Sequence, residues 1–339
     1  MIVLSNCLTE TVDEGCLKLA NSLIKRIKQK NTDTTVVAYQ RKGNIADVYF
    51  KLNKFFLNFS FLKYLRNKKD EILFIPFPTR SLPMAIRAFV LSVFTKKAIR
   101  IVLTMKQDFG TLSKKLLFSK KVSFIVFSRD VADYYRNVFA NKKIEYLKCG
   151  VDTKKFVPAT DNEREKLREK YNIPLDKNVI LHVGHLNYGR NVDKLLNISD
   201  EYFVLLVTST LTKSEQDLEL KQKLLSRENI KLVDDYIKNI EEIYQLSDIY
   251  FFPVVKDGHC IDIPLSCMEA AACNLPVITT DFGEMKEFIG KDDFYFTNDF
   301  DSKKINSIIN DILLQKEFGS RNAVLCYDWN KAVAEISAS

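Results

Sequence analysis

Short apolar segments alternate with helical stretches along most of the 339-residue chain, and this alternation restricts the fold more than any other feature. Helical patterns such as 16–30 and 129–139 lie between the apolar segments. This order is typical of parallel α/β sheets, whose ligands bind at the C-terminal ends of the strands. We expect strands at 2–5, 35–39, 71–75, 99–104, 122–127 and 144–148 and, in the second half, at 179–183, 203–207, 230–233, 249–253 and 276–279.

The length of the chain predicts two domains. One hydrophobic core rarely serves so many residues, so we expect two doubly wound, Rossmann-like domains in series, 1–150 and the part that follows. Residues 149–158 and a charged surface helix at 161–170 form the expected linker. Two such domains would hold a ligand in the cleft between them.

Cysteine usage and hydropathy favour a cytoplasmic protein. Seven cysteines, an odd number without a C-x-x-C pair, fit reduced thiols better than disulfides or a zinc site. The first residues lack the basic lead and apolar length of a signal peptide. The longest apolar candidate, 82–95, carries Arg87 and is shorter than a bilayer span, so we interpret it as a core helix.

Charge is divided unevenly between the two halves. Residues 1–150 hold 28 Lys and Arg against 11 Asp and Glu, a net charge of +17, whereas the remainder holds 23 against 32, a net charge of −9. Lysines surround aromatic residues in 49–69, which suits a surface lying on anionic lipid headgroups. Nucleic acid binding and a plain solvated helix face are the alternatives.

Glu269 is the one charged residue in an apolar stretch, 263–273, that runs directly into a strand. A helix that is apolar on nearly every face is buried, and a buried carboxylate needs a hydrogen-bond donor. Either a ligand supplies this donor, or Glu269 reaches a solvated edge of the protein or a backbone donor. We expect Asp262 to cap this helix and Pro264 to lie in its first turn, so that free amides there face an anion.

A glycine-containing loop, 184–193, follows the strand 179–183. Gly184 lets a ligand approach the backbone, and His185 and Arg190 place two donors before the next helix, where phosphate oxygens bind. The loop is not a Walker motif, because Arg190-Asn191 replaces the required Lys-Ser/Thr. The alternative is a tight turn with an exposed arginine.

Four segments in order resemble family 4 glycosyltransferases of the GT-B fold. They are Cys149-Gly-Val-Asp-Thr-Lys-Lys-Phe-Val-Pro158, Val183-Gly-His-Leu followed by Arg190-Asn-Val-Asp193, Ser247-Asp-Ile-Tyr-Phe-Phe-Pro253, and Met268-Glu-Ala-Ala-Ala-Cys-Asn-Leu-Pro-Val-Ile-Thr-Thr-Asp-Phe-Gly283. The ending, 326–339, resembles the family's last helix, which crosses back to the N-terminal domain. The resemblance implies an acceptor-binding domain at 1–150 and a nucleotide-sugar-binding domain at 151–325.

The resemblance also implies the chemistry and its residues. The family transfers a sugar from a nucleotide diphosphate sugar with retention of configuration. By position, His185 and Arg190 would neutralise the leaving diphosphate, and Glu269 would bind the nucleotide ribose. No metal cofactor is implied, because backbone groups would take the phosphates. The implied donor-binding residues are Gly15, Gly184, Ile263, Pro264, Leu265 and Ser266, and Lys106 or Gln107 would face the acceptor.

The chain departs from the family at one acidic position. The first Glu of the family's acidic pair falls on Ile261, so either the adjacent Asp262 substitutes or Asp262 is only the helix cap. We therefore expect a retaining hexosyltransferase that acts on a glycan or lipid-linked acceptor in cell-surface polysaccharide or glycolipid synthesis, peripheral at the inner membrane face. The alternatives are a catalytically impaired partner or nucleotide-binding subunit, and an epimerase or phosphorylase of related fold.

Overall fold

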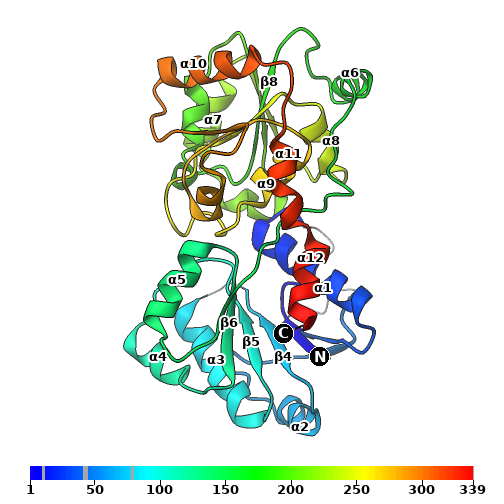
Figure 1. Ribbon diagram of the computed structural model, residues 1–339, viewed down its shortest axis with the longest axis vertical. Helices are drawn as coiled ribbons and strands as arrows, with labels where there is room; N and C mark the ends of the chain where they lie inside the picture. Colours follow the sequence, from blue (N-terminus) through cyan, green and yellow to red (C-terminus); the bar gives the residue numbers. More distant parts are fainter. Residues whose placement is uncertain (10–11, 41–44, 78–79, 339) are drawn as a thin grey trace. The chain divides into compact units, whose positions relative to one another are not determined.

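The computed structural model describes residues 1–9, 12–40, 45–77 and 80–338 of the chain (Figure 1). These residues form two compact units. The first contains residues 1–148 and returns at the C-terminus with 329–339, and the second contains residues 149–328.

The first unit is a seven-stranded parallel sheet in the order β3-β2-β1-β4-β5-β6-β7. Helices α3, α4 and α5 cover one face of this sheet and α1 and α12 the other (Figure 1). The elements are β1 (Ile2–Ser5), α1 (Gly15–Lys30), β2 (Thr35–Tyr39), β3 (Val48–Phe50), α2 (Phe59–Asn67), β4 (Ile72–Ile75), α3 (Ser81–Phe94), β5 (Ile99–Val102), α4 (Thr111–Leu116), β6 (Val122–Val126), α5 (Arg129–Val138), β7 (Ile144–Tyr146) and α12 (Trp329–Ala338).

Buried arginines hold two helices of the first unit in place. Arg100 on β5 is 3% exposed, and its Nη2 donates to the carbonyl of Ile336 in α12 and to Glu71, both at 2.9 Å. In α3, Arg87 donates from Nε to the carbonyl of Lys54 at 3.2 Å and lies over the ring of Phe56. The interpretation of 82–95 as a core helix is confirmed, because these contacts satisfy its only charge.

The second unit is a six-stranded parallel sheet in the order β10-β9-β8-β11-β12-β13. Its strands and helices are α6 (Asp161–Lys170), β8 (Val179–Val183), η1 (Tyr188–Arg190), η2 (Val192–Asn197), β9 (Phe203–Val207), η3 (Thr210–Glu215), α7 (Leu218–Leu225), β10 (Ile230–Val233), α8 (Ile240–Gln245), β11 (Ile249–Phe252), α9 (Leu265–Ala272), β12 (Val277–Thr279), η4 (Gly283–Phe288), β13 (Phe294–Phe296), α10 (Ser302–Leu313), α11 (Ser320–Val324) and η5 (Leu325–Tyr327).

All the expected strands are present, with ends within two residues of the expected ones. Sequence reasoning missed β3 and β13, which are three-residue strands at sheet edges. Most of their residues are only half-buried, so they lack the continuous apolar run that marks the inner strands.

Two expectations about loops are wrong. In place of the helix expected after 184–193, two short 3₁₀ helices are found: η1 lies within this loop and η2 begins in it, and Asn191 separates them in the left-handed region with φ 55°. The side-chain amide of Asn191 donates to the carbonyl of Pro253 at 3.0 Å, and asparagine tolerates this backbone conformation.

The segment 149–158 is not a free linker. Cys149, Val151 and Phe156 are buried, and Val151 forms a β-bridge with Asp328. The charged helix that follows, α6, is also anchored, because Arg168 is buried and its Nη2 lies 2.6 Å from Asp248. Both segments are therefore part of the second unit.

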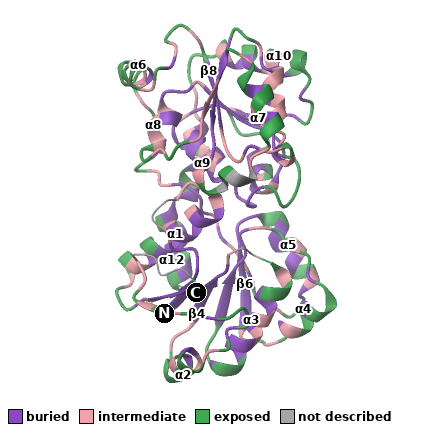
Figure 2. Ribbon diagram, turned by 180° about the vertical axis from the view of Figure 1, so that it is seen from behind, coloured by how far each residue is buried: buried purple, intermediate pink, exposed green. Residues whose placement is uncertain are grey.

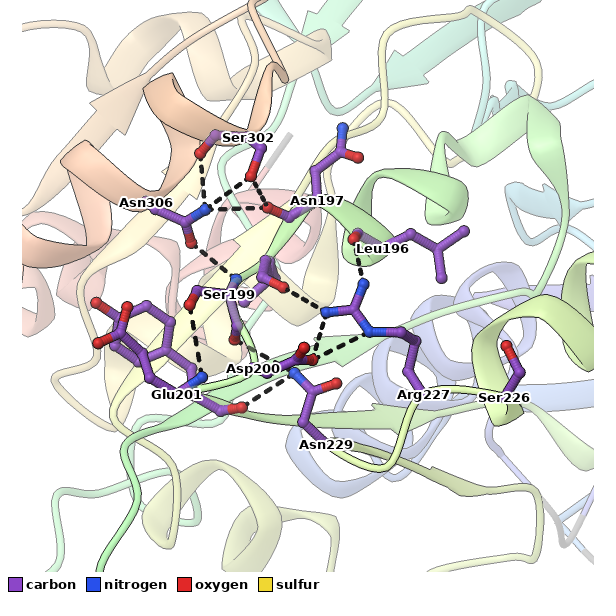
Figure 3. Close-up of polar contacts among 12 residues, drawn as sticks. Leu196, Asn197, Ser199, Asp200, Glu201, Ser226, Arg227, Asn229, Ser302 and Asn306 are labelled. Atoms are coloured by element: carbon purple, nitrogen blue, oxygen red, sulfur yellow. Dashed lines mark hydrogen bonds and ion pairs between the residues drawn. The ribbon is translucent and has the colours of Figure 1, made fainter.

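A polar network stabilises the N-terminal edge of the second sheet (Figure 3). Arg227 donates to the carbonyl of Leu196 at 2.8 Å and to the carboxylate of Asp200 at 2.5 Å. Asn306, from α10, accepts from the amide of Ser199 at 2.9 Å. Since these loops precede β9, β10 and α10, the network lies at the N-terminal ends of the strands, opposite their C-terminal ends.

Exposed apolar side chains are prominent on the first unit. Phe59 at the start of α2 is 83% exposed, and Phe118 after α4 is 72% exposed. Figure 2 shows exposed stretches along both helices, while the strands between them are buried. No helix within the described ranges is long and apolar enough to cross a membrane.

Candidate functional site at the ends of β8 and β11

The chain order of the second sheet reverses between β8 and β11, where β9 lies on one side of β8 and β11 on the other. Their pairing ends at Tyr250↔Leu181. Beyond it, side chains reach backbone carbonyls on the neighbouring strand. Nδ1 of His182 lies 2.8 Å from the carbonyl of Phe251, and the hydroxyl of Tyr250 donates to the carbonyl of Val183 at 3.2 Å. Ligands of doubly wound sheets bind where strands diverge in this way.

Arg190 is a cation at the C-terminal ends of β8 and β11. Its side chain is anchored by Nε, which donates to the carbonyl of His259 at 2.7 Å, and the residue is only 9% exposed. Within the described part of the chain, the hydrogen bonds of Arg190 come from its backbone amide and from Nε, and none comes from its terminal nitrogens Nη1 and Nη2. The alternative of a tight turn with an exposed arginine is therefore wrong. Arg190 is instead a buried, anchored cation whose terminal nitrogens bond no described residue.

Two glycines make room for this arrangement. A Cβ on Gly184 would lie 2.4 Å from Nη1 of Arg190, so only glycine lets the guanidinium approach the end of β8. A Cβ on Gly189 would lie 2.1 Å from the ring of His259. The loop after β11 thus packs onto the loop after β8 through His259. His185 directly follows Gly184 and is half-buried.

The start of α9 differs from the expectation. Asp262 is not its cap; Pro264 is the N-cap residue, in an extended conformation without a side-chain cap bond. Proline disfavours the helical conformation at the residue before it, so the helix does not extend back to Ile263. Proline has no N–H, so Pro264 cannot donate to a phosphate. Of the four residues expected to do so, Ile263, Leu265 and Ser266 carry amides.

Glu269 has a partner inside its own unit. It is 2% exposed, and its Oε2 accepts from the hydroxyl of Tyr244 on α8 at 3.0 Å. Tyr244 is therefore one partner of this buried carboxylate, which does not reach a solvated edge. Burial, and then the nearby Glu269 carboxylate, raise the pKa of Tyr244 well above its usual range, so the hydroxyl remains a donor.

The backbone of Asp262 is held by the turn after β12. Its carbonyl accepts from the amide of Glu284 at 2.8 Å, and Gly283 has a φ of +54°. A Cβ on Gly283 would lie 2.2 Å from that carbonyl oxygen. Glu284 itself is 1% exposed, and Oε1 accepts from the hydroxyl of Tyr327 at 2.6 Å. Sequence reasoning missed this buried acid.

The structure brings Gly184, His185 and Arg190 together in one loop. Burial raises the pKa of the Cys267 thiol in α9 well above its usual range, and the nearby Arg190 cation acts in the opposite direction. The residues missed at this edge are His182 and His259. His182 lies within the last two residues of β8, and His259 lies in the segment that follows β11. Their places after or near the ends of two central strands were the available signal, because segments at the C-terminal ends of neighbouring parallel strands meet.

The remaining expected residues lie in the first unit. Gly15 is the first residue of α1, after the N-cap Glu14. The amide of Gln107 donates to the hydroxyl of Tyr135 at 2.6 Å, and Nζ of Lys106 lies 5.0 Å from the ring centroid of Tyr134.

The cysteines of the chain are free thiols, and all but Cys326 are buried. Among the side chains that the structure describes, no group of three or more His, Cys, Asp or Glu is arranged to hold a metal ion.

Comparison with known proteins places the chain among structures of one architecture. A glycosyltransferase from Rickettsia africae superimposes with a TM-score of 0.79 at 15% identity, covering 99% of this chain and 97% of that one. HepE from Anabaena, in complex with UDP and glucose, gives 0.74 at 16% identity, covering 100% and 99%. Sucrose-phosphate synthase from Thermosynechococcus elongatus gives 0.76 at 15% identity, covering 99% and 97%.

Among curated proteins, no sequence matches the chain. The family model of glycosyl transferases group 1 matches residues 163–324, which form most of the second unit and include the ends of β8 and β11. The expected fold is confirmed: the chain has the GT-B fold of two parallel-sheet α/β domains, and its second domain is similar to group 1 glycosyl transferases.

Proposed function

We propose that the protein is a glycosyltransferase that takes its sugar from a nucleotide diphosphate sugar. The observation that carries the proposal is Arg190, a buried guanidinium anchored by Nε with terminal nitrogens that bond no described residue, at the point where β8 and β11 diverge. The match of 163–324 to group 1 glycosyl transferases supports it. So does the likeness to HepE, whose structure contains UDP and glucose.

The proposed chemistry assigns the leaving diphosphate to Arg190 and His185. Negative charge grows on the diphosphate as the sugar bond breaks, and donors already held in place stabilise it. The amides of Ile263, Leu265 and Ser266 add further donors, so the proposal includes no metal cofactor. Gly184 lets the diphosphate approach the backbone.

Glu269 is assigned to the nucleotide ribose. Tyr244 holds its Oε2, which restricts the carboxylate to one orientation. Asp262 would contact the transferred sugar in place of the acid that Ile261 lacks. Attack of the acceptor on the face from which the diphosphate departs would retain the configuration of the sugar.

The acceptor is assigned to the first unit, with Gly15 close to the donor and with Lys106 and Gln107 on the acceptor side. Its net charge of +17 over residues 1–150 suits a glycan or lipid-linked acceptor at an anionic membrane surface. We therefore place the protein in the cytoplasm, peripheral at the inner membrane face, in polysaccharide or glycolipid synthesis.

Membrane binding is tested with liposomes that contain anionic lipid. Neutralising the exposed Lys51, Lys54, Lys63 and Lys68 should abolish sedimentation with them. The matched control neutralises four exposed lysines of the second unit, Lys166, Lys291, Lys303 and Lys304, and should leave binding intact. Equal binding by both variants would reject the membrane proposal.

Turnover is tested by donor hydrolysis and transfer with the purified chain, after a thermal-shift screen of UDP, GDP, ADP and their common sugars. Turnover that disappears in Arg190→Ala and Glu269→Ala supports the enzyme. A second candidate is a catalytically impaired partner or nucleotide-binding subunit, which Ile261 favours because this apolar residue is 4% exposed where the resemblance expects an acid. Tight nucleotide binding without any turnover would establish that candidate.

A further inference from the structure

His182 is the penultimate residue of β8, at the candidate site, and its contacts define a role for it. It is completely buried, and Nδ1 lies 2.8 Å from the carbonyl oxygen of Phe251. A carbonyl only accepts hydrogen bonds, so Nδ1 must carry the proton. In the neutral ring, Nε2 is then a bare acceptor.

This acceptor has no donor within the described ranges of the chain, although Nε2 is shielded from solvent. Buried polar atoms of this kind are rare in folded proteins. Nε2 lies 3.0 Å from the point where a Cβ of Gly184 would be, and Nη1 of Arg190 lies 2.4 Å from the same point. A fixed acceptor and a cationic donor therefore face the same side of Gly184.

The surroundings keep His182 neutral. Burial, with a smaller contribution from the Arg190 cation, lowers its pKa to about 4, while the bond to Phe251 acts in the opposite direction. An imidazolium at this position would repel the guanidinium, whereas the neutral ring places an uncharged acceptor on the same side of Gly184.

We infer that His182 is a positioning residue for Arg190: no hydrogen bond joins the two side chains in this structure, and the partial negative charge of the unprotonated Nε2 attracts the guanidinium into the orientation that binds the diphosphate. The inference rests on the proposed function for its ligand. It concerns a residue that does not touch the diphosphate but acts through one that does.

The test separates the two ring nitrogens. His182→Asn keeps a donor for Phe251 and removes the Nε2 acceptor, whereas His182→Gln restores an acceptor near the position of Nε2. The probe is whichever of UDP, GDP and ADP stabilises the wild type most, with the matching nucleoside as control. His182→Asn should bind the diphosphate roughly tenfold more weakly and the nucleoside unchanged. His182→Gln should recover part of that affinity.

A double-mutant cycle tests whether His182 affects diphosphate binding through Arg190. In an Arg190→Ala background, His182→Asn should have no further effect on diphosphate affinity, and an undiminished effect there overturns the inference. So does an unchanged affinity of the single variant.

Two nitrogen-15 NMR measurements need no nucleotide. The first of them uses the wild type alone and needs no variant. In the wild type at pH 7, labelled histidine should show His182 with a proton on Nδ1 alone, and a proton on Nε2 overturns the inference. Labelled arginine should show that the terminal Nη groups of Arg190 rotate faster in His182→Asn than in the wild type or, if that variant does not fold, faster in His182→Phe; unchanged rotation overturns the inference. If these results hold but no nucleotide binds, the positioning role stands and the proposed function fails.

Discussion

Replacing Gly184 by alanine would introduce a methyl group where Arg190 and His182 approach each other. The Cβ would lie 2.4 Å from Nη1 of Arg190, a distance that real Cβ atoms do not show. The end of an arginine side chain can move, and Gly184 is not among the residues with positive φ, so its backbone accepts alanine. We therefore expect the guanidinium to be displaced and the fold to persist.

The magnitudes follow from the bonds that Arg190 makes. Moving it breaks the bond from Nε to His259, which should lower the free energy of unfolding by about 1 kcal/mol. The bond to a phosphate oxygen is charge-assisted, so its loss should cost about 1.5–3 kcal/mol, or roughly 10- to 150-fold in nucleoside diphosphate affinity. Calorimetric titration and urea unfolding measure the two quantities.

Gly283→Ala is the matched control. There φ is +54° and the Cβ would lie 2.2 Å from the backbone oxygen of Asp262, which cannot move alone. We expect a loss of about 2 kcal/mol or more in unfolding free energy. The reasoning is refuted if Gly184→Ala binds the nucleotide as the wild type does, or if it destabilises the fold as much as Gly283→Ala.

Three further perturbations address buried polar groups. Tyr244→Phe removes the donor to Glu269 and should lower the unfolding free energy by about 1–3 kcal/mol in urea titrations; no change would show that this bond is dispensable. Arg100→Ala leaves the carbonyl of Ile336 without its donor, so hydrogen exchange should accelerate in α12 before other helices, and uniform exchange would contradict this anchor. Because the pKa of His182 falls from 6.5 to about 4 on folding, the unfolded chain binds the extra proton, and stability should decline by about 3 kcal/mol as pH falls through this window. His182→Asn should lack that part of the decline, and a parallel decline would refute the assignment.

The strands could be predicted because buried parallel strands are continuous apolar runs. Val179–Val183 and Phe203–Val207 begin and end where the sequence indicated. The same rule fails for Val48–Phe50 and Phe294–Phe296, because an edge strand needs no such run. The interpretation of α9 as buried around Glu269 holds for a similar reason, since a helix apolar on nearly every face has to be covered.

Other site features depended on residues far apart in the chain. The donor to Glu269 is Tyr244, the acceptor for Arg190 is the backbone of His259, and the bond that sets the tautomer of His182 comes from Phe251. None of these partners follows from a local pattern. Each pair meets because β8 and β11 are neighbours in the sheet or because α8 lies near α9.

Local chain physics is enough to locate the apolar runs, the turns that glycine permits and the two-domain layout, because these depend on residues that are near one another in sequence. The orientation of each buried charged side chain, and the hydrogen bonds that satisfy it, depend on which loops meet at the C-terminal ends of the strands. That is settled by the strand order and by the packing of 253–264 onto 184–191, since a hydrogen bond forms only between atoms that the completed fold brings within about 3 Å.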